Sequence, residues 1–318
     1  MASAAHRRRG LALLGALGSL VASGRWGALG LAGLASAYAQ SLPPTLTKAI
    51  PKTGERLPAV GLGSWITFNV GTDRAGQQAS LEVVRAFFAE GGRLIDSSPM
   101  YGSSQPTIGL ALKALGLPAT LFSAEKVWIG DAASGAAQIE TSRSHWGVPR
   151  FDLMQVHNLV SWQEHLPRLF EIKARGALRY VGVTTSHGRR HDEIERILRT
   201  QPIDFLQISY SLLDREIEAR ILPLAAERQV AVIVNRPFRE GALLEQLARR
   251  PLPGWAAELG CRHWAQVALK FVISHPAVTC AIPATSRVDH LRQNMAAARG
   301  VMPDAAMRTR MAADVAAM

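Results

Sequence analysis

The stretch RLIDSSPMYG, residues 93–102, ends a short apolar run on a carboxylate and places a phenol on the loop that follows. Leu94 and Ile95 are typical of a buried strand, and the Ser-Ser-Pro run after Asp96 is a turn signal. In parallel α/β proteins, chemically active side chains gather where strands end and loops begin. The stretch therefore predicts a strand, a loop and a candidate site at their junction, with Asp96 and Tyr101 as its first members.

Similar β-rich runs recur along the chain, with helical patterns such as 76–92 and 192–200 between them. The predicted strands are 59–65, 93–98, 120–128, 151–158, 178–185, 204–210, 230–237 and 278–285. Eight strands that alternate with helices, without a break in composition, predict an α/β fold of the closed (β/α)8 type, the TIM barrel. An open doubly wound sheet is the alternative, but no GxGxxG motif follows the first strand.

The segment LTKAIPKTGERLPA, residues 46–59, precedes the first predicted strand. Pro51 and the Lys-Thr-Gly run that follows it are turn signals between apolar residues. We therefore expect an N-terminal β-hairpin that closes the floor of the barrel.

Residues 1–39 have the pattern of an export signal, with a basic start, a Gly- and Ala-rich apolar stretch and small residues at the end. Arg8 and Arg9 resemble the pair of a twin-arginine signal. We expect cleavage after Ala39 to leave a barrel domain of residues 40–318 in the periplasm or outside the cell, with the twin-arginine export machinery as a partner. A membrane anchor is the alternative, but an Arg-Trp pair divides the apolar stretch into pieces too short to span ~30 Å. No stable membrane anchor is expected after cleavage.

The formal net charge of +11 would suit a nucleic-acid partner, but the four arginines of residues 1–39 contribute part of it. The other charges form mixed-sign runs such as RRHDEIER, so we expect no nucleic-acid binding. Cys261 and Cys280 are the only thiols. An oxidising compartment would allow one bridge between them, and core packing of Cys280 is the alternative. Neither HExxH nor a cysteine-rich spacing predicts a metal site.

Three neighbouring predicted strands end on residues that can do acid–base chemistry. The second ends on Asp96, the third on Lys126 and the fourth on His157, and Tyr101 lies on the loop after the second. Because parallel strands of a barrel end at the same mouth, we expect these four side chains to converge. Each alone is more often a packing or ion-pair residue, but their joint placement predicts an active site.

The chain resembles the aldo/keto reductase family over nearly all of residues 40–318. The resemblance is carried by AVGLGSW, RLIDSSPMYGSSQPTIGLAL, SAEKVW, DLMQVHNL, YVGVTT, DFLQISYS and HPAVTCAIPATSRVDHLRQNMAAA. It implies that Asp96, Tyr101, Lys126 and His157 match the catalytic tetrad of the family. The reaction it implies is hydride transfer between NADP(H) and a small aldehyde or ketone.

The chemistry of carbonyl reduction explains these residue types. A free phenol near pKa 10 is a weak acid at neutral pH, so Tyr101 needs help to act as the general acid. Lys126, as a nearby cation, would favour the phenolate, and Asp96 would keep Lys126 charged and oriented. His157 would donate a hydrogen bond to the carbonyl oxygen and stabilise the charge that develops there.

For the nicotinamide end of the cofactor, the resemblance implies contacts at the ends of strands one, five, six and seven. These residues are Ser64, Thr184, Thr185, Gln207, Asn235, Arg236 and Pro237. Thr184 and Thr185 stand where the family usually has Ser-Asn, so a hydroxyl is kept and an amide is lost. Asn235 stands where the family often stacks an aromatic ring on the nicotinamide. Its presence either weakens binding or leaves the stacking to Trp65 or Phe238.

The stretch IPATSRVDHLRQN matches the family's segment for the adenosine phosphate, at the start of a helix whose amides suit an anion. The matched residues are Thr285, Ser286, Arg287, His290 and Asn294. Arg287 is the candidate for the 2′-phosphate, so NADP is favoured and NAD stays open. A solvated helix face is the alternative role for Arg287, and His290 stands where an arginine is common.

Trp65, at the end of the first strand, is expected to wall the substrate pocket, whereas Trp128, Trp146 and Trp264 are expected to pack in the core. A non-catalytic nicotinamide-binding module or redox-sensing subunit on the same barrel is the alternative function. The departures at strands five and seven favour it. A barrel hydrolase is a third interpretation, for which the sequence offers neither paired carboxylates nor metal ligands.

Overall fold

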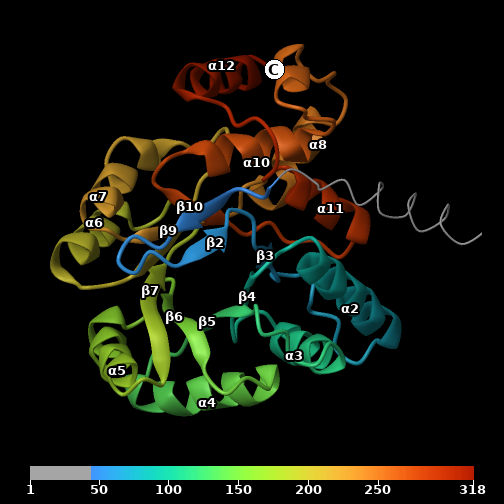
Figure 1. Cartoon of the computed structure of the whole chain (residues 1–318). Coiled ribbons are helices and arrows are strands. Elements are labelled where there is room, and N and C mark those ends of the chain that lie inside the picture. Colours follow the sequence, from blue (N-terminus) through green and yellow to red (C-terminus); the bar gives the residue numbers. More distant parts are fainter. Residues whose placement is uncertain (1–43) are drawn as a thin grey trace, which may run out of the picture. The chain divides into compact units, whose positions relative to one another are not determined.

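The computed structural model describes residues 44–318, and eight parallel strands form the centre of this part of the chain (Figure 1). Their bounds are β3 (Leu62–Gly63), β4 (Leu94–Asp96), β5 (Phe122–Val127), β6 (Phe151–His157), β7 (Leu178–Thr184), β8 (Phe205–Ser209), β9 (Ala231–Asn235) and β10 (Val278–Ala281). Each strand pairs with its neighbour in chain order, from β3 to β10. All eight lie inside the predicted ranges.

Two backbone bridges join the first and last strands. Val60 pairs with Ala281 and Gly63 with Ala284, both in parallel. At Gly63 a Cβ atom would stand 2.6 Å from the carbonyl oxygen of Ile282, so only glycine permits this approach. The sheet therefore closes, which confirms the predicted TIM barrel and contradicts the open-sheet alternative.

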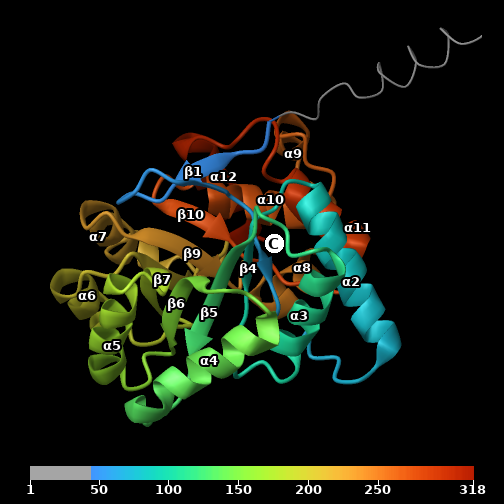
Figure 2. The same cartoon turned by 60° about the horizontal axis from the view of Figure 1, so that its bottom comes forward.

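Helices lie around the outside of the strands (Figures 1 and 2). Their bounds are α2 (Arg74–Ala89), α3 (Ser104–Ala114), α4 (Gly135–Trp146), α5 (Trp162–Ala174), α6 (His191–Thr200), α7 (Ile221–Glu227), α8 (Ala242–Leu247), α9 (Trp255–Glu258), α10 (Trp264–Ser274), α11 (Val288–Ala296) and α12 (Ala305–Ala316). Short 3-10 turns occur at η1 (Ala132–Ser134), η2 (Glu216–Glu218) and η3 (Arg239–Gly241).

Helix α2 illustrates how the sequence determines where a helix begins and which of its faces is buried. The Asp73 carboxylate caps α2 by accepting the backbone N–H groups of Ala75 and Gly76. Val83, Val84 and Phe87 follow at helical spacing and are buried. Such apolar stripes form the core between the helices and the outer faces of the strands.

The N-terminal hairpin covers the end of the barrel where the strands begin. β1 (Thr47–Ala49) and β2 (Arg56–Pro58) pair antiparallel. Ile50 and Leu57 are fully buried and belong to the cluster inside the barrel, with inward-facing residues such as Phe122 at the start of β5. The predicted hairpin therefore exists and closes the floor.

The predicted export signal of residues 1–39 lies outside the described residues. Within residues 44–318, no helix has the length and apolar character needed to cross a membrane. Cys261 and Cys280 are both buried and free. Cys280 lies in the core on β10, which is the packing role that the sequence left open.

Candidate active site

Asp96 and Lys126 form a buried ion pair at the mouth of the barrel. Asp96 ends β4 and Lys126 lies on β5, and their side chains are 2% and 0% exposed. Lys126 Nζ donates to Asp96 Oδ1 at 2.5 Å and to the backbone oxygen of Ser97 at 2.6 Å. Burial opposes a charge on Lys126, but Asp96 and Tyr101 outweigh it and raise the pKa of Lys126. The pair therefore holds a fixed ammonium group at this point.

The carboxylate of Asp96 is anchored from several strands. Gln207 Nε2 on β8 donates to Asp96 Oδ2 at 2.8 Å, and Gln155 Nε2 on β6 donates to the same oxygen at 3.2 Å. The Ser64 hydroxyl donates to the backbone oxygen of Asp96 at 2.8 Å. Thr184 Oγ1 donates to Gln207 Oε1 at 3.3 Å. Ser64 and Gln207, both expected as cofactor contacts, thus also hold the acid of the tetrad in place.

Tyr101 lies on the loop after β4, over the ion pair. Lys126 Nζ is 5.1 Å from the centroid of the Tyr101 ring, and the rings of Trp65 and His157 lie 4.9 and 5.7 Å away from it. Burial raises the pKa of Tyr101, and the charge of Lys126 opposes this shift without overcoming it. The sequence predicted the direction of the effect of Lys126 but not the larger effect of burial. The phenol therefore keeps its proton at neutral pH and can donate it.

His157 ends β6 and is 5% exposed. Its Nδ1 atom lies 2.7 Å from the hydroxyl oxygen of Ser98. Burial, and after it the charge of Lys126, lowers the pKa of His157 from the usual 6.5 to about 2. The imidazole is therefore neutral, and it can donate a hydrogen bond without carrying a charge.

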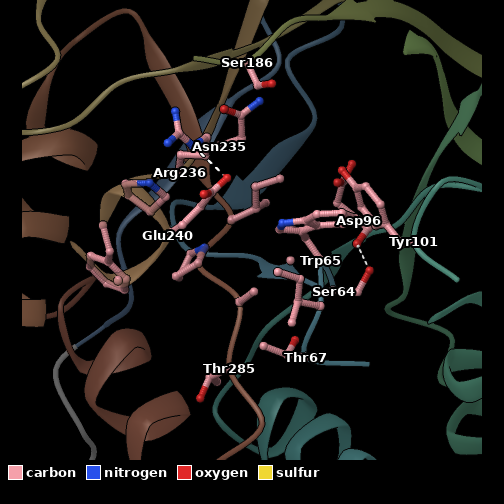
Figure 3. A pocket seen from close by; sticks show the side chains of 18 of the residues that line it. Ser64, Trp65, Thr67, Asp96, Tyr101, Ser186, Asn235, Arg236, Glu240 and Thr285 are labelled. Carbon is pink, nitrogen blue, oxygen red and sulfur yellow. Dashed lines mark hydrogen bonds and ion pairs between the residues drawn. The ribbon is translucent and has the colours of Figure 1, made fainter. Parts of the chain in front are cut away.

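The tetrad residues Asp96, Tyr101 and His157 line a cavity of about 430 Å³ at the barrel mouth. Figure 3 shows Asp96 and Tyr101 on one side of this pocket, Asn235 and Arg236 on the other, and Trp65 between them. Lys126 lies beneath the lining, because its ammonium group is fully buried. The four predicted catalytic residues therefore converge, and three of them reach the pocket directly.

Some residues around the pocket were missed by the sequence analysis. Trp128, expected in the core, is 41% exposed, and its ring lies 6.5 Å from that of His157, so this expectation was wrong. Trp128 lies two residues after Lys126, and residues at this spacing in a strand point to the same face. This spacing was the signal in the sequence that could have placed Trp128 near the candidate site. At the other side, Glu240 forms an ion pair with Arg236 at 3.1 Å, and its carboxylate oxygen lies 3.3 Å from Nε2 of His187, whose pKa burial lowers. No spacing in the sequence indicates this cluster.

The profile of the aldo/keto reductase family matches residues 59–313, most of the chain. The chain belongs to this family. Among curated relatives, it is 28% identical over 245 residues to methylglyoxal reductase YeaE of Escherichia coli, covering 76% of this chain and 85% of that protein. It is 27% identical over 247 residues to the NADH-specific methylglyoxal reductase of Escherichia coli, covering 66% of this chain and 73% of that protein.

Solved structures share the barrel of this aldo/keto reductase. One is an aldo/keto reductase from Klebsiella pneumoniae in complex with NADP and acetate, with a TM-score of 0.70 and 23% identity, covering 83% of this chain and 93% of that one. Another is the holo form of aldo-keto reductase AKR11C1 from Bacillus halodurans, with a TM-score of 0.71 and 22% identity, covering 86% and 96%. At 22–23% identity, the similarity to these two structures supports the fold of this chain and nothing more specific.

Most of the expected cofactor residues of this aldo/keto reductase share the pocket of the tetrad. Those that line it are Ser64, Thr184, Gln207, Asn235, Arg236, Pro237, Thr285, His290 and Asn294, together with the expected substrate residue Trp65. Thr185, Ser286 and Arg287 do not line it. Expected residues at the end of β9, just before α11 and within α11 therefore share one cavity with Asp96, Tyr101 and His157.

Asn235, which replaces the family's stacking aromatic, is held by the protein itself. Ser209 Oγ donates to Asn235 Oδ1 at 2.7 Å, and Asn235 Nδ2 donates to the backbone oxygen of Thr185 at 2.9 Å. Both ends of the amide are therefore used. Trp65 packs against Tyr101, and Phe238 lines the pocket. Either ring could therefore provide the flat apolar surface on which the nicotinamide stacks in other members of the family.

Arg287 is paired with an acid on its own helix. Its guanidinium forks the carboxylate of Asp289, with Nη2 at 2.7 Å and Nε at 3.1 Å, and both side chains are more than half exposed. Thr285 Oγ1 accepts the backbone N–H of Arg287 at 3.1 Å. Arg287 therefore lies outside the pocket lining, and its guanidinium can bind another charged group only by sharing or leaving Asp289.

Proposed function

We propose that this aldo/keto reductase reduces the carbonyl group of a small aldehyde or ketone to an alcohol with NADPH. The observation that carries the proposal is the chain from Asp96 through Lys126 to Tyr101, which together with His157 reaches one pocket. A buried cation, a protonated phenol and a neutral imidazole are the groups that carbonyl reduction requires. The test is consumption of NADPH by the purified protein when methylglyoxal or a simple aldehyde is added.

The polar groups that the pocket leaves without partners fit a dinucleotide. Thr67 Oγ1, in the pocket lining, and Thr185 Oγ1, beside it, are buried and have no hydrogen-bond partner among residues 44–318. At the other end of the pocket, Thr285 lies just before α11, and Asn294 lies in the last turn of that helix. When bound, NADPH supplies the hydride. A relative whose structure contains NADP supports this choice, and an NADH-specific relative keeps NAD open.

The residues of the tetrad divide the proton chemistry among them. His157 donates a hydrogen bond from its ring to the carbonyl oxygen and so fixes the substrate. The Tyr101 hydroxyl gives its proton to the same oxygen as negative charge develops there. Lys126 stabilises the phenolate that remains, and Asp96 keeps Lys126 oriented through the 2.5 Å hydrogen bond. In the reverse reaction the phenolate takes the proton back.

The walls of the pocket favour a small, weakly polar carbonyl compound. Trp65 and Met100 line the cavity next to Tyr101, and the ring of Trp128 lies 6.5 Å from that of His157. Two relatives are methylglyoxal reductases, which makes short α-dicarbonyl compounds the first substrates to test. Comparing kcat/KM for methylglyoxal with that for a bulky aromatic ketone tests this choice.

We also propose that residues 1–39 are a twin-arginine export signal and that the barrel domain acts in the periplasm or outside the cell. The support is the sequence alone: a basic start with Arg8 and Arg9, an apolar stretch, and small residues before Ala39. Residues 1–45 fused to a reporter that works only after folded export are expected to lose the signal when Arg8 and Arg9 both become Lys. Continued export of that variant by the twin-arginine route contradicts the proposal.

The alternative is a nicotinamide-binding module without catalysis, which the internally held Asn235 and the replacement at Thr185 favour. Such a module would bind NADPH without consuming it. The assay with methylglyoxal or a simple aldehyde separates the two functions, because binding alone leaves the NADPH concentration unchanged after the carbonyl compound is added.

A further inference from the structure

Ser98 is a buried side chain that contacts the tetrad and that has no role in the proton chemistry of Tyr101 and Lys126. It is fully buried, two residues after Asp96 on the loop that carries Tyr101. Its hydroxyl oxygen lies 2.7 Å from His157 Nδ1 and accepts the backbone N–H of Met100 at 3.2 Å. Among the described residues, Ser98 is the only hydrogen-bond partner of His157 Nδ1.

The hydrogen-bonding capacity of Ser98 limits how it can bind His157. A hydroxyl has one proton to donate, and here its oxygen already accepts from Met100. If the imidazole donated from Nδ1, the oxygen would accept twice and the buried hydroxyl proton would have no acceptor among the described residues. If Ser98 donates to Nδ1, every group is satisfied. The second arrangement leaves the ring proton on Nε2.

We propose that Ser98 is a positioning residue that donates its hydrogen bond to His157 Nδ1 and thereby keeps the ring proton on Nε2. With Nδ1 held by the loop, Nε2 is the ring nitrogen left for the substrate. This inference rests on the proposed role of His157 as a hydrogen-bond donor to the carbonyl oxygen. It explains how a neutral imidazole donates in a fixed direction: the opposite tautomer would present a lone pair to that oxygen and repel it.

The backbone at this loop explains why Ser98 and not Ser97 takes this role. Ser97 Oγ lies 2.9 Å from Ser104 Oγ at the start of α3, away from His157. Pro99 follows Ser98 and restricts its backbone to extended conformations, and the contacts with His157 Nδ1 and the Met100 N–H hold its hydroxyl. Ser97 and Ser104 thus form a second buried hydroxyl contact in the same loop, and Ser104→Ala gives a matched control.

The tautomer can be measured directly on the full protein. In protein labelled with ¹⁵N-histidine, the His157 signals are assigned by their loss in His157→Gln, and their shifts report which ring nitrogen carries the proton. We expect a protonated Nε2 and an unprotonated Nδ1, with and without NADPH. A protonated Nδ1 in the wild-type protein overturns the proposal, and this measurement does not depend on any variant being stable or active.

The kinetic test compares Ser98→Ala with Ser104→Ala. Ser98→Ala is expected to lower kcat for carbonyl reduction roughly 10-fold, less than the ~100-fold or more that loss of a direct donor costs, because His157 itself remains. The Kd for NADPH should stay the same, and a signal from protonated Nδ1 should appear. Ser104→Ala should keep kcat within about twofold. Equal kcat values for Ser98→Ala and the wild type overturn the proposal, whereas an inactive wild-type protein counts against the proposed function instead.

Discussion

The two ends of the barrel both carry charged networks, but only one of them reaches a pocket. At the floor, Glu55 binds Arg93 at 3.2 Å, Tyr180 at 2.8 Å and Arg179, and Arg179 Nη1 binds Asp152 at 2.7 Å. Glu55 belongs to the hairpin that covers this end, so its bonds hold the cover in place.

At the mouth, the pair of Asp96 and Lys126 is more deeply buried than any pair at the floor, and it lies under a phenol that lines a cavity. A buried ion pair is by itself weak support for stability, because desolvation offsets the attraction. The difference teaches that charge at the strand starts secures the fold, whereas charge at the strand ends is arranged for proton transfer.

The largest expected effect is at the mouth. Lys126→Met removes the cation that stabilises the phenolate, so carbonyl reduction should slow by ~100- to 10,000-fold. The matched control is Lys173→Met, since Lys173 also pairs with a buried aspartate, Asp204, at 2.6 Å but lies away from the pocket. Its kcat should match that of the wild type. Similar losses in both variants would show that a lysine–aspartate pair at either end supports activity through stability alone, and the mouth would then not differ from the floor.

At the floor, the opposite result is expected. Glu55→Gln weakens the contacts to Arg179, Arg93 and Tyr180 and should lower the free energy of unfolding by about 1–3 kcal/mol. Denaturant unfolding measures this loss. Steady-state kcat for carbonyl reduction should stay within about twofold. A tenfold fall in kcat, with the folded protein intact, would mean that the floor also serves the chemistry.

A smaller effect is expected from Arg287, an exposed charge two residues after the pocket-lining Thr285. Arg287→Ala should raise the Kd for NADPH by roughly 3- to 10-fold and leave that for NADH unchanged, because a guanidinium can fork the 2′-phosphate but is already shared with Asp289. Arg292→Ala on the same helix is the control, and neither Kd should change. Equal losses for NADPH and NADH would leave Arg287 as part of a solvated helix face.

The last pair of effects is in the pH dependence of stability. His157 has a folded pKa of about 2 and an unfolded pKa near 6.5, so the unfolded chain takes up its proton first and stability falls as pH drops below 6.5. Burial opposes the charge on Glu55, but Tyr180 and Arg179 lower its pKa overall, so its contribution is present above its unfolded pKa near 4.5 and is lost on further acidification. In plots of Tm against pH, His157→Gln should flatten the curve between pH 6.5 and 5, and Glu55→Gln only below pH 4.5. The assignments of the two pH ranges to His157 and Glu55 would be contradicted if Glu55→Gln flattened the curve between pH 6.5 and 5 and His157→Gln only below pH 4.5.

Much of the fold could be predicted, because its signals are local. Each strand is a short apolar run, and the pattern around Asp96 located both the strand end and the loop that carries Tyr101. The tetrad could be predicted because strand ends of a barrel meet at one mouth, so order along the chain gives proximity in space.

Contacts between distant strands could not be predicted in this way. Ser98 and His157 are 59 positions apart, and Gln207 and Asp96 are 111 apart, so these hydrogen bonds depend on side-chain directions that only the closed barrel sets. Trp128 was placed wrongly in the core because a large aromatic ring is usually buried, whereas in this barrel the strand ends just before it at the pocket. Local patterns thus predicted that Asp96, Tyr101, Lys126 and His157 converge, but not the hydrogen bonds from Ser98 and Gln207 that hold two of them.

The most direct test of the central claim is Tyr101→Phe, compared with Tyr180→Phe at the floor. Tyr101→Phe keeps the ring beside Trp65 and removes only the proton donor, so the Kd for NADPH should be unchanged while the rate of carbonyl reduction falls by ~100- to 10,000-fold. Tyr180→Phe deletes a phenol of the floor network and should lower stability without changing this rate. If Tyr101→Phe reduces aldehydes within a few-fold of the wild type, the claim that the barrel mouth transfers protons through Tyr101 is contradicted.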